Sequence, residues 1–219
     1  MVFLKINNKI MIKTIITARC GSQEIKNKNI TNLNSKPLLW YAINSSLKSL
    51  SNETWVSTDC KKIADIALEL GAKVIIRPQE ISNNSSKSEE ALLHFTQNID
   101  FDILVFIQPT SPLLLPEDIN KGLDMISNYD SVFSAYKEHW IPRWNMDSEP
   151  DNWNINNRPM RQDMPEKYVE NGALYITTKK ALLQSRCRYS GKIGILEMPQ
   201  SRSFQIDTQD DLDLIAKLI

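Results

Sequence analysis

Short runs of apolar residues alternate along this chain with segments in which apolar residues recur at helical spacing. Continuous apolar runs of about four to eight residues are typical of strands that are buried on both faces. Such runs predict strands at 13–18, 54–57, 73–76, 103–107, 132–136, 173–176 and 193–198. Strands that alternate with helices favour a mainly parallel sheet covered on both faces, and ligands of such sheets bind at the carboxyl ends of the strands.

Helical periodicity fills the intervals between these strands. One predicted helix opens at Pro37, and the next is expected to be capped by Asp59 and ended by Gly71. Further helices are predicted at 88–95, 116–126 and 210–219.

The segment 138–167 breaks this alternation, because its apolar residues follow no clear period. It contains three of the five tryptophans, Trp140, Trp144 and Trp153. Aromatic residues outside a periodic core often mark an interface, and structureless stretches of this length are uncommon inside compact domains. We therefore expect an arm that packs on a partner subunit, rather than a long surface loop.

The composition of the chain argues against nucleic-acid-binding and membrane-spanning classes of protein. The chain has 219 residues, enough for one α/β domain over 1–219, and its 26 Lys plus Arg balance 26 Asp plus Glu. Without a global basic field no nucleic-acid partner is expected, and without an apolar run of about 18–20 residues no membrane association is expected. Met11 precedes the first strand, so residues 1–10 are interpreted as either an upstream extension or a start-site artefact, and they lack the features of a signal peptide.

Cysteine and histidine usage argues against metal-binding scaffolds and disulfide frameworks. Cys20, Cys60 and Cys187 are odd in number and widely spaced, which suits the reducing cytoplasm. His94 and His139 are the only histidines, so a histidine-rich metal site is not expected.

A polar, basic loop follows the first predicted strand. Gly21 and Ser22 would let backbone N–H groups turn toward an anion, and Arg19 and Lys28 would add two cations. Phosphoryl transfer needs such donors against the charge that develops at phosphorus. Neither a P-loop nor a dinucleotide-binding fingerprint is present, because the glycine spacings of both are absent. A loop of this kind is more often a solvated connection, so the residues alone leave both interpretations open.

Short motifs follow one another from about residue 13 to residue 212. They are, in order, Ala18-Arg19-x-Gly21-Ser22 with Lys28-Asn29-Ile30, Lys36-Pro37-Leu38, Val56-Ser57-Thr58-Asp59, Arg77-Pro78-x-Glu80, Gln108-Pro109-Thr110-Ser111-Pro112-Leu113, Arg161-Gln162-Asp163-x-Pro165, Asn171-Gly172-Ala173-x-Tyr175-Ile176 and Ile206-Asp207-Thr208. Each motif is weak alone, but their order resembles that of the CMP-sialic acid synthetase (acylneuraminate cytidylyltransferase) family.

The resemblance implies a Rossmann-like three-layer α/β/α fold with a mainly parallel sheet. It implies one nucleotidyltransferase domain with a protruding dimerisation arm at about 138–167, and usually a homodimer. The implied reaction transfers CMP from CTP to the anomeric hydroxyl of a nonulosonic acid of the sialic, legionaminic or pseudaminic type. Pyrophosphate is released, Mg²⁺ is the cofactor, and the partners are CTP and an acidic nine-carbon sugar.

The resemblance also assigns roles to individual positions. Catalytic residues would be Arg19 and Lys28, which bind and polarise the CTP phosphates, and Asp207, the magnesium ligand. CTP would be bound by Ala18, Arg19, Gly21, Ser22, Lys28, Asn29, Arg77, Ser86 and Ser88. The sugar would be bound by Gln108, Arg161, Asn171 and Tyr175, with the Arg161 guanidinium forking onto the sugar carboxylate.

Plainer interpretations of these residues exist. Taken singly, Asp207 reads as a helix cap, Arg161 as a surface ion-pair residue and Asn171 as part of an ordinary turn. No side chain is an obvious general base for the sugar hydroxyl.

Five positions depart from the resembled pattern. The usual Lys is Gln23 and the usual Gly is Glu24, so a cation is lost and an anion gained beside the triphosphate site. Gln205 replaces the first of two aspartates, which leaves Asp207 as a single carboxylate. Val169 and Leu114 replace arginines on the sugar side, and these changes favour a nonulosonate other than common sialic acid.

Two alternatives accompany the leading hypothesis. One is a catalytically weak or inactive nucleotide-binding homologue, motivated by the changes at 23, 24 and 205. The other is a cytidylyltransferase for an eight-carbon 3-deoxy-octulosonate, which the Arg-Gln-Asp and Asn-Gly-Ala motifs disfavour.

Overall fold

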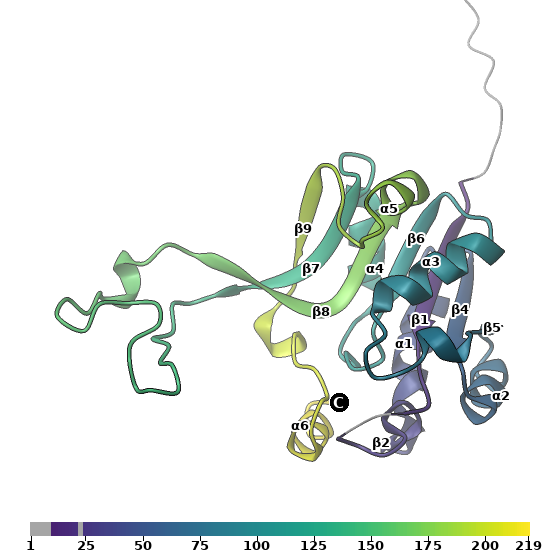
Figure 1. Cartoon of the computed structure of the whole chain (residues 1–219), viewed down its shortest axis with the longest axis horizontal. Coiled ribbons are helices and arrows are strands. Elements are labelled where there is room, and N and C mark those ends of the chain that lie inside the picture. Colours follow the sequence, from purple (N-terminus) through teal and green to yellow (C-terminus); the bar gives the residue numbers. More distant parts are fainter. Residues whose placement is uncertain (1–9, 22–23) are drawn as a thin grey trace, which may run out of the picture.

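The computed structural model describes residues 10–21 and 24–219. At its centre, a seven-stranded sheet has the strand order β5-β4-β1-β6-β8-β7-β9 (Figure 1). The strands are β1 (Ile12–Thr17), β4 (Glu53–Thr58), β5 (Lys73–Ile76), β6 (Ile103–Ile107), β7 (Ser131–Glu138), β8 (Lys167–Thr178) and β9 (Ile193–Glu197). Only β8 runs antiparallel to its neighbours in this sheet, so the predicted mainly parallel sheet is confirmed.

Helices cover both faces of the sheet and complete three layers. One face packs against α1 (Leu38–Leu47), α2 (Lys61–Glu69) and α4 (Pro116–Met125). The other face packs against α3 (Ser88–Asn98) and α5 (Lys179–Ser185). A third apolar cluster joins α6 (Gln209–Ile215) to α1 and to the hairpin of β2 (Asn32–Leu33) and β3 (Lys36–Pro37). The predicted α/β/α architecture is therefore confirmed.

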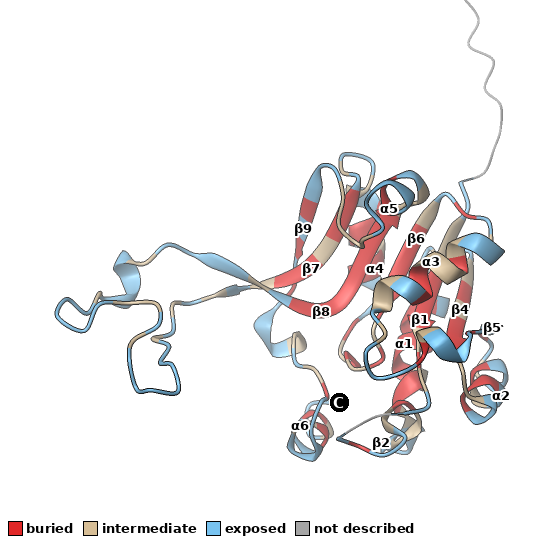
Figure 2. Cartoon of the chain, in the orientation of Figure 1, coloured by how far each residue is buried: buried red, intermediate tan, exposed pale blue. Residues whose placement is uncertain are grey.

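Burial on both faces explains why the strands read as continuous apolar runs. Ile15 and Ile16 are adjacent in β1, yet both are 0% exposed, because one points to each helical layer. Figure 2 shows buried residues concentrated in β1, β6 and the body of β8. Side chains on alternate sides of a strand that are both buried are what a sheet with two covered faces requires.

The predicted cap of α2 is wrong, although the predicted end is right. Cys60, not Asp59, occupies the N-cap position, and no side chain caps this helix. The Asp59 carboxylate instead accepts a hydrogen bond from the backbone N–H of Cys20 at 2.9 Å. Gly71 follows the last helical residues with φ +88°, a conformation that glycine adopts without steric cost.

The segment between β7 and β8 protrudes from the body of the protein (Figure 1). The two strands leave the sheet as a paired ribbon, in which Lys137 lies opposite Tyr168 and Glu138 opposite Lys167. Inside the arm, the rings of Trp144 and Trp153 meet edge to face at 5.1 Å. The predicted protruding arm is therefore present, and small aromatic contacts give it internal order.

A buried ion pair fixes the start of α4 to the chain that leads into α6. The Asp118 carboxylate, 3% exposed, accepts from the backbone N–H of Leu115 at 3.0 Å and from both terminal nitrogens of Arg202. The carboxylate also raises the pKa of the Arg202 guanidinium, since it stabilises the charged form. The pair thus connects the end of the loop that follows β6 to the segment that leads into α6.

Replacing Asp118 by asparagine should destabilise the fold. We expect a loss of about 2 kcal/mol, less than the ~3–5 kcal/mol of a fully buried pair, because 25% of the Arg202 side chain remains exposed. Urea denaturation followed by circular dichroism measures the change. Glu117→Gln, which neutralises an exposed carboxylate in the same helical turn, is the control; equal unfolding midpoints for the two variants would contradict the prediction.

No helix within 10–21 and 24–219 combines the length and the apolar composition that a bilayer crossing requires.

Candidate active site

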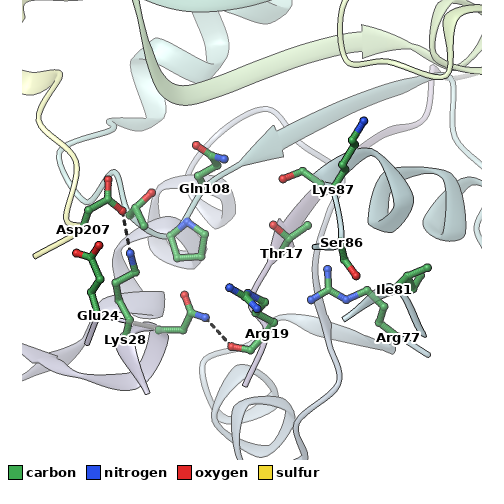
Figure 3. Close-up of a pocket in the computed structure, with 14 residues that line it drawn as sticks. Thr17, Arg19, Glu24, Lys28, Arg77, Ile81, Ser86, Lys87, Gln108 and Asp207 are labelled. Atoms are coloured by element: carbon green, nitrogen blue, oxygen red, sulfur yellow. Dashed lines mark hydrogen bonds and ion pairs between the residues drawn. The ribbon is translucent and has the colours of Figure 1, made fainter. Parts of the chain in front are cut away.

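A cavity of about 340 Å³ opens over the carboxyl ends of β1, β5 and β6 (Figure 3). Its walls come from the loops after these strands, from the start of α3 and from the segment before α6. The lining residues are Thr17, Arg19, Glu24, Lys28, Asn29, Arg77, Ile81, Ser86, Lys87, Ser88, Gln108, Pro109, Thr110 and Asp207. This is the edge of the sheet where an open α/β fold binds its ligands.

Hydrogen bonds fix the loop after β1 at both of its ends. The backbone N–H of Ala18 donates to the carbonyl oxygen of Ser57 at 3.0 Å, which extends the pairing of β1 with β4. The amide of Asn29, 8% exposed, donates to the carbonyl oxygen of Arg19 at 2.9 Å. The Arg19 guanidinium then reaches across the cavity and donates to Asn84 Oδ1 at 2.5 Å. The loop is thus shaped by its own polar residues, with one guanidinium turned into the cavity.

An ion pair joins the first loop to the last segment of the chain. Lys28 Nζ lies 2.9 Å from Asp207 Oδ1 and also donates to the carbonyl oxygen of Ile206 at 3.1 Å. Ile206 itself is fixed to the loop after β6, because its backbone N–H donates to the carbonyl oxygen of Thr110 at 2.8 Å. These bonds bring the cation and the carboxylate to one wall of the cavity.

Arg77 supplies a buried positive charge at the opposite wall. The residue is 6% exposed, and its Nε donates to Ser82 Oγ at 3.1 Å. Burial lowers the pKa of the Arg77 guanidinium, an effect that the nearby Asp59 carboxylate opposes. A guanidinium remains charged even after a sizeable shift, so Arg77 projects a positive potential from a weakly hydrated position.

The cavity is positive although the whole chain is neutral. Four cationic side chains, Arg19, Lys28, Arg77 and Lys87, line it against two carboxylates, Glu24 and Asp207. Over the full sequence, 26 basic residues balance 26 acidic ones. The excess of positive charge at one concave site is suited to a compact polyanion such as a triphosphate.

The structure brings most of the predicted nucleotide residues together. The cavity wall contains Arg19, Lys28, Asn29, Arg77, Ser86, Ser88, Gln108 and Asp207. Ala18 is 0% exposed and packs in the core behind the wall. Gly21 is exposed beyond the lining residues, and Ser22 and Gln23 lie outside the described residues.

Asn171 and Tyr175, predicted to bind the sugar, face the protein interior and not this cavity. The Asn171 carboxamide accepts from Ser134 Oγ at 2.6 Å and donates to Ser203 Oγ at 3.0 Å. The Tyr175 ring stacks on Phe106 at 5.4 Å, and its hydroxyl donates to Glu170. Their polar groups are already paired, so both residues shape the strand rather than the cavity wall.

Arg161 lies in the arm, away from the cavity of its own chain. It forms a short 3-10 helix, Arg161–Asp163, beside a second hollow of about 340 Å³ that also involves Glu138, Trp140 and Glu166. The residue is exposed, and none of the ion pairs among the described residues includes it. Within one chain, the structure separates Arg161 from Gln108.

Several lining residues were not predicted. They are Thr17, Glu24, Ile81, Lys87, Pro109 and Thr110. Pro109 and Thr110 lie in the motif that begins at Gln108, and their place in that motif was a usable signal. Lys87 directly precedes α3 and lies between Ser86 and Ser88, two predicted CTP-binding residues, so its position was also a usable signal.

The available oxygen donors fit a magnesium ion that is shared with a nucleotide. Among the described residues, no group of three His, Cys, Asp or Glu side chains could hold a metal ion on its own. The cavity does contain two carboxylates, Asp207 and Glu24. Mg²⁺ is usually bound through one or two carboxylates together with substrate phosphates and water, so a protein-only site is not needed here.

Cys20 is exposed next to the cavity residue Arg19, and its surroundings disfavour the thiolate form. Its contact with Cys60, followed by partial burial and the negative charge of Asp59, raises the pKa of the Cys20 thiol to about 11. A thiol with such a pKa is protonated at neutral pH, and the thiolate is the reactive form. Cys20, Cys60 and Cys187 are all free thiols.

Comparison with known proteins adds independent support. A family model described as cytidylyltransferase matches residues 13–219. N-acylneuraminate cytidylyltransferase B of Danio rerio is 39% identical over 207 residues, covering 90% of this chain and 48% of that protein. The chain thus spans about half the length of this relative and of other N-acylneuraminate cytidylyltransferases that it matches.

A bacterial relative matches along nearly its whole length. CMP-N,N'-diacetyllegionaminic acid synthase of Legionella pneumophila is 32% identical over 225 residues, covering 95% of this chain and 96% of that protein. Among solved structures, a CMP:2-keto-3-deoxy-manno-octonic acid synthetase in complex with CTP superposes with a TM-score of 0.69 and 18% identity. It covers 95% of this chain and 98% of its own, and at this identity the likeness concerns the fold alone.

Proposed function

This chain belongs to the cytidylyltransferase family, in the branch of the CMP-sialic acid synthetases, and on that premise we propose that it transfers CMP from CTP to an acidic nine-carbon sugar. The anomeric hydroxyl of a nonulosonic acid of the sialic, legionaminic or pseudaminic type is the acceptor. A cytoplasmic location is part of the proposal, and the three free thiols are consistent with a reducing compartment.

The observation that carries this proposal is the convergence of motif residues on one positive cavity. Arg19 and Lys28 come from the loop after β1 and Arg77 from the loop after β5, and the three meet at the carboxyl edge of the sheet. The triphosphate of CTP carries the highest charge density among the proposed substrates. A cavity with four cations against two carboxylates is expected to attract it more strongly than the sugar acid, which carries a single carboxylate.

In the proposed reaction, the residues that line the cavity have separate roles. The oxygen of the anomeric hydroxyl forms a bond to the α-phosphorus, while the bond from that phosphorus to the bridging oxygen breaks. Pyrophosphate leaves with the electron pair, and the hydroxyl proton passes to solvent. Arg19 and Lys28 would bind phosphate oxygens and offset the negative charge that grows during the transfer. Asp207 would hold Mg²⁺, which when bound adds further neutralisation of the phosphates.

The part of the cavity at Gln108 is suited to the sugar. Gln108 lies there next to Gly172, so close that a Cβ on Gly172 would come within 2.8 Å of Gln108 Oε1. A carboxamide provides both a donor and an acceptor, which suits the hydroxyl and amide groups of a nonulosonic acid.

We further propose that two copies associate through the arm. The arm exposes large apolar side chains, among them Trp144, Met146 and Ile155, and isolated proteins rarely present so much apolar surface without a partner. Arg161 on the same arm would then reach the cavity of the second copy, where its guanidinium could pair with the sugar carboxylate. This arrangement accounts for the separation of Arg161 from Gln108 within one chain.

A substrate panel tests the proposal. We expect that CTP, Mg²⁺ and the protein release pyrophosphate with at least one of sialic, legionaminic and pseudaminic acid, and that mass spectrometry identifies the CMP-sugar. The eight-carbon 3-deoxy-octulosonate belongs in the same panel, and reactions with UTP or without sugar are the controls. Bound CTP without turnover on any acid would favour the inactive homologue, and turnover only on the eight-carbon acid would favour that alternative.

A further inference from the structure

We propose that Glu24 is the second carboxylate of the divalent-ion site, acting with Asp207 in place of the carboxylate that is missing at position 205. This inference rests on the proposed function, because the ion is needed only if a nucleoside triphosphate occupies the cavity. It concerns a residue of this chain that the resemblance assigns no role and that departs from the resembled pattern.

Position 205 cannot supply a ligand in this structure. Gln205 has a neutral carboxamide, and its Nε2 donates to the carbonyl oxygen of Asn171 at 2.5 Å. The same nitrogen lies so close to Gly172 that a Cβ on that residue would be only 1.8 Å away. Gln205 therefore serves as a brace between the final segment and β8, and its side chain is committed there.

Glu24 supplies a carboxylate on the cavity wall that also holds Asp207. Glu24 and Asp207 both line the cavity, and Figure 3 shows their carboxylates on the same side, flanking the amine of Lys28. Lys28 forms its ion pair with Asp207 at 2.9 Å, whereas no ion pair of the described residues includes Glu24. Asp207 is 62% exposed at its side chain, so its remaining oxygen faces the open cavity.

Charge balance on this wall favours a further cation. Two carboxylates and one ammonium group leave a net charge of about −1 where the triphosphate is expected to lie. A carboxylate that faces a phosphate without an intervening cation weakens binding, since like charges at short range repel. A divalent ion between the carboxylates and the phosphates removes this repulsion, and two carboxylates plus phosphate oxygens are a donor set that Mg²⁺ accepts. The single ammonium of Lys28 is not sufficient for both carboxylates.

Metal binding, measured without turnover, tests the inference. Mn²⁺ binding to the protein with CTP present and sugar absent is followed by electron paramagnetic resonance, after correction for Mn²⁺ held by free CTP. We expect Glu24→Gln to weaken Mn²⁺ binding at least about tenfold, comparable with Asp207→Asn. Glu24→Asp should retain part of the affinity, and Glu69→Gln, which neutralises an exposed carboxylate on α2, should leave it unchanged.

In a second measurement, made without a divalent ion, the Glu24→Gln substitution is expected to strengthen CTP binding instead of weakening it. In EDTA, with no divalent ion, Glu24→Gln should bind CTP more tightly than the parent protein, because the repelling carboxylate is gone. Unchanged Mn²⁺ affinity in Glu24→Gln, with CTP still bound, would overturn the role of Glu24 and leave the proposed function intact. Failure of the parent protein to bind CTP at all would instead overturn the proposed function.

Discussion

Replacing Arg19 by alanine is expected to lower kcat/KM for CTP about a thousandfold, with little change in stability. The Arg19 guanidinium lines the cavity and its one described side-chain partner is the exposed Asn84. Its removal therefore costs few contacts within the fold. The loss falls on the phosphates, because a planar guanidinium provides paired donors that a water molecule does not replace.

Steady-state release of pyrophosphate measures this effect once an acceptor sugar is known. Lys61→Ala is the matched control, since Lys61 is a cation at the start of α2 with a side chain that is 88% exposed. It should retain parental activity. Arg19→Lys should recover only part of the loss, because an ammonium group lacks the forked geometry. An Arg19→Ala variant as active as the parent would refute the assignment of this loop to the phosphates.

Replacing Gly172 by alanine is expected to destabilise the protein by about 3 kcal/mol and to impair the sugar end of the cavity. Gly172 has φ +68°, where a side chain is strained, and a Cβ would lie 1.8 Å from Gln205 Nε2 and 2.8 Å from Gln108 Oε1. Both glutamines would have to move. The hydrogen bond from Gln205 to Asn171 and the position of Gln108 would be lost together.

Thermal unfolding and the KM for the sugar report these two effects separately. Gly21→Ala is the stability control, because a Cβ at Gly21 would meet nothing within 4 Å. We expect its unfolding midpoint to stay close to that of the parent. If Gly172→Ala unfolded at the parental temperature, the tight packing between β8 and Gln205 would have to be looser than described.

Long, doubly buried strands were predictable from the sequence because both of their faces are apolar. The run at 103–107 corresponds to β6 residue for residue. The run at 73–76 also corresponds to β5, although β5 is an edge strand with no buried residue. The β2–β3 hairpin and α5 were missed, since strands of two residues and a helix of seven carry too few positions to show a period. Asp59 was assigned to a helix cap because local rules cannot see a backbone N–H that arrives from another loop.

For the candidate site, too, the sequence indicated the location of some residues but not of others. The structure brings Arg19, Lys28 and Asp207 together at one cavity, because motifs at strand ends converge wherever a parallel sheet forms. It does not bring Asn171 and Tyr175 there, since a motif gives a position along β8 but not the direction in which each side chain points. Tyr175 lies opposite Phe106, within the cluster under α3 and α5, and Asn171 is held by neighbours on other segments. The role proposed for Arg161 requires a second copy of the chain, which the sequence of one chain does not describe.

β8 is one strand that belongs to both the central sheet and the arm. Its inner half is clamped in the sheet beside Gln108, whereas its outer half forms the root of the arm, where Lys167 and Tyr168 pair with β7. Gly172, with φ +68°, lies between these two parts of β8. Under the proposed association of two copies, the contacts made by the arm would act on the same strand that lies beside Gln108, so association and sugar binding would be thermodynamically linked.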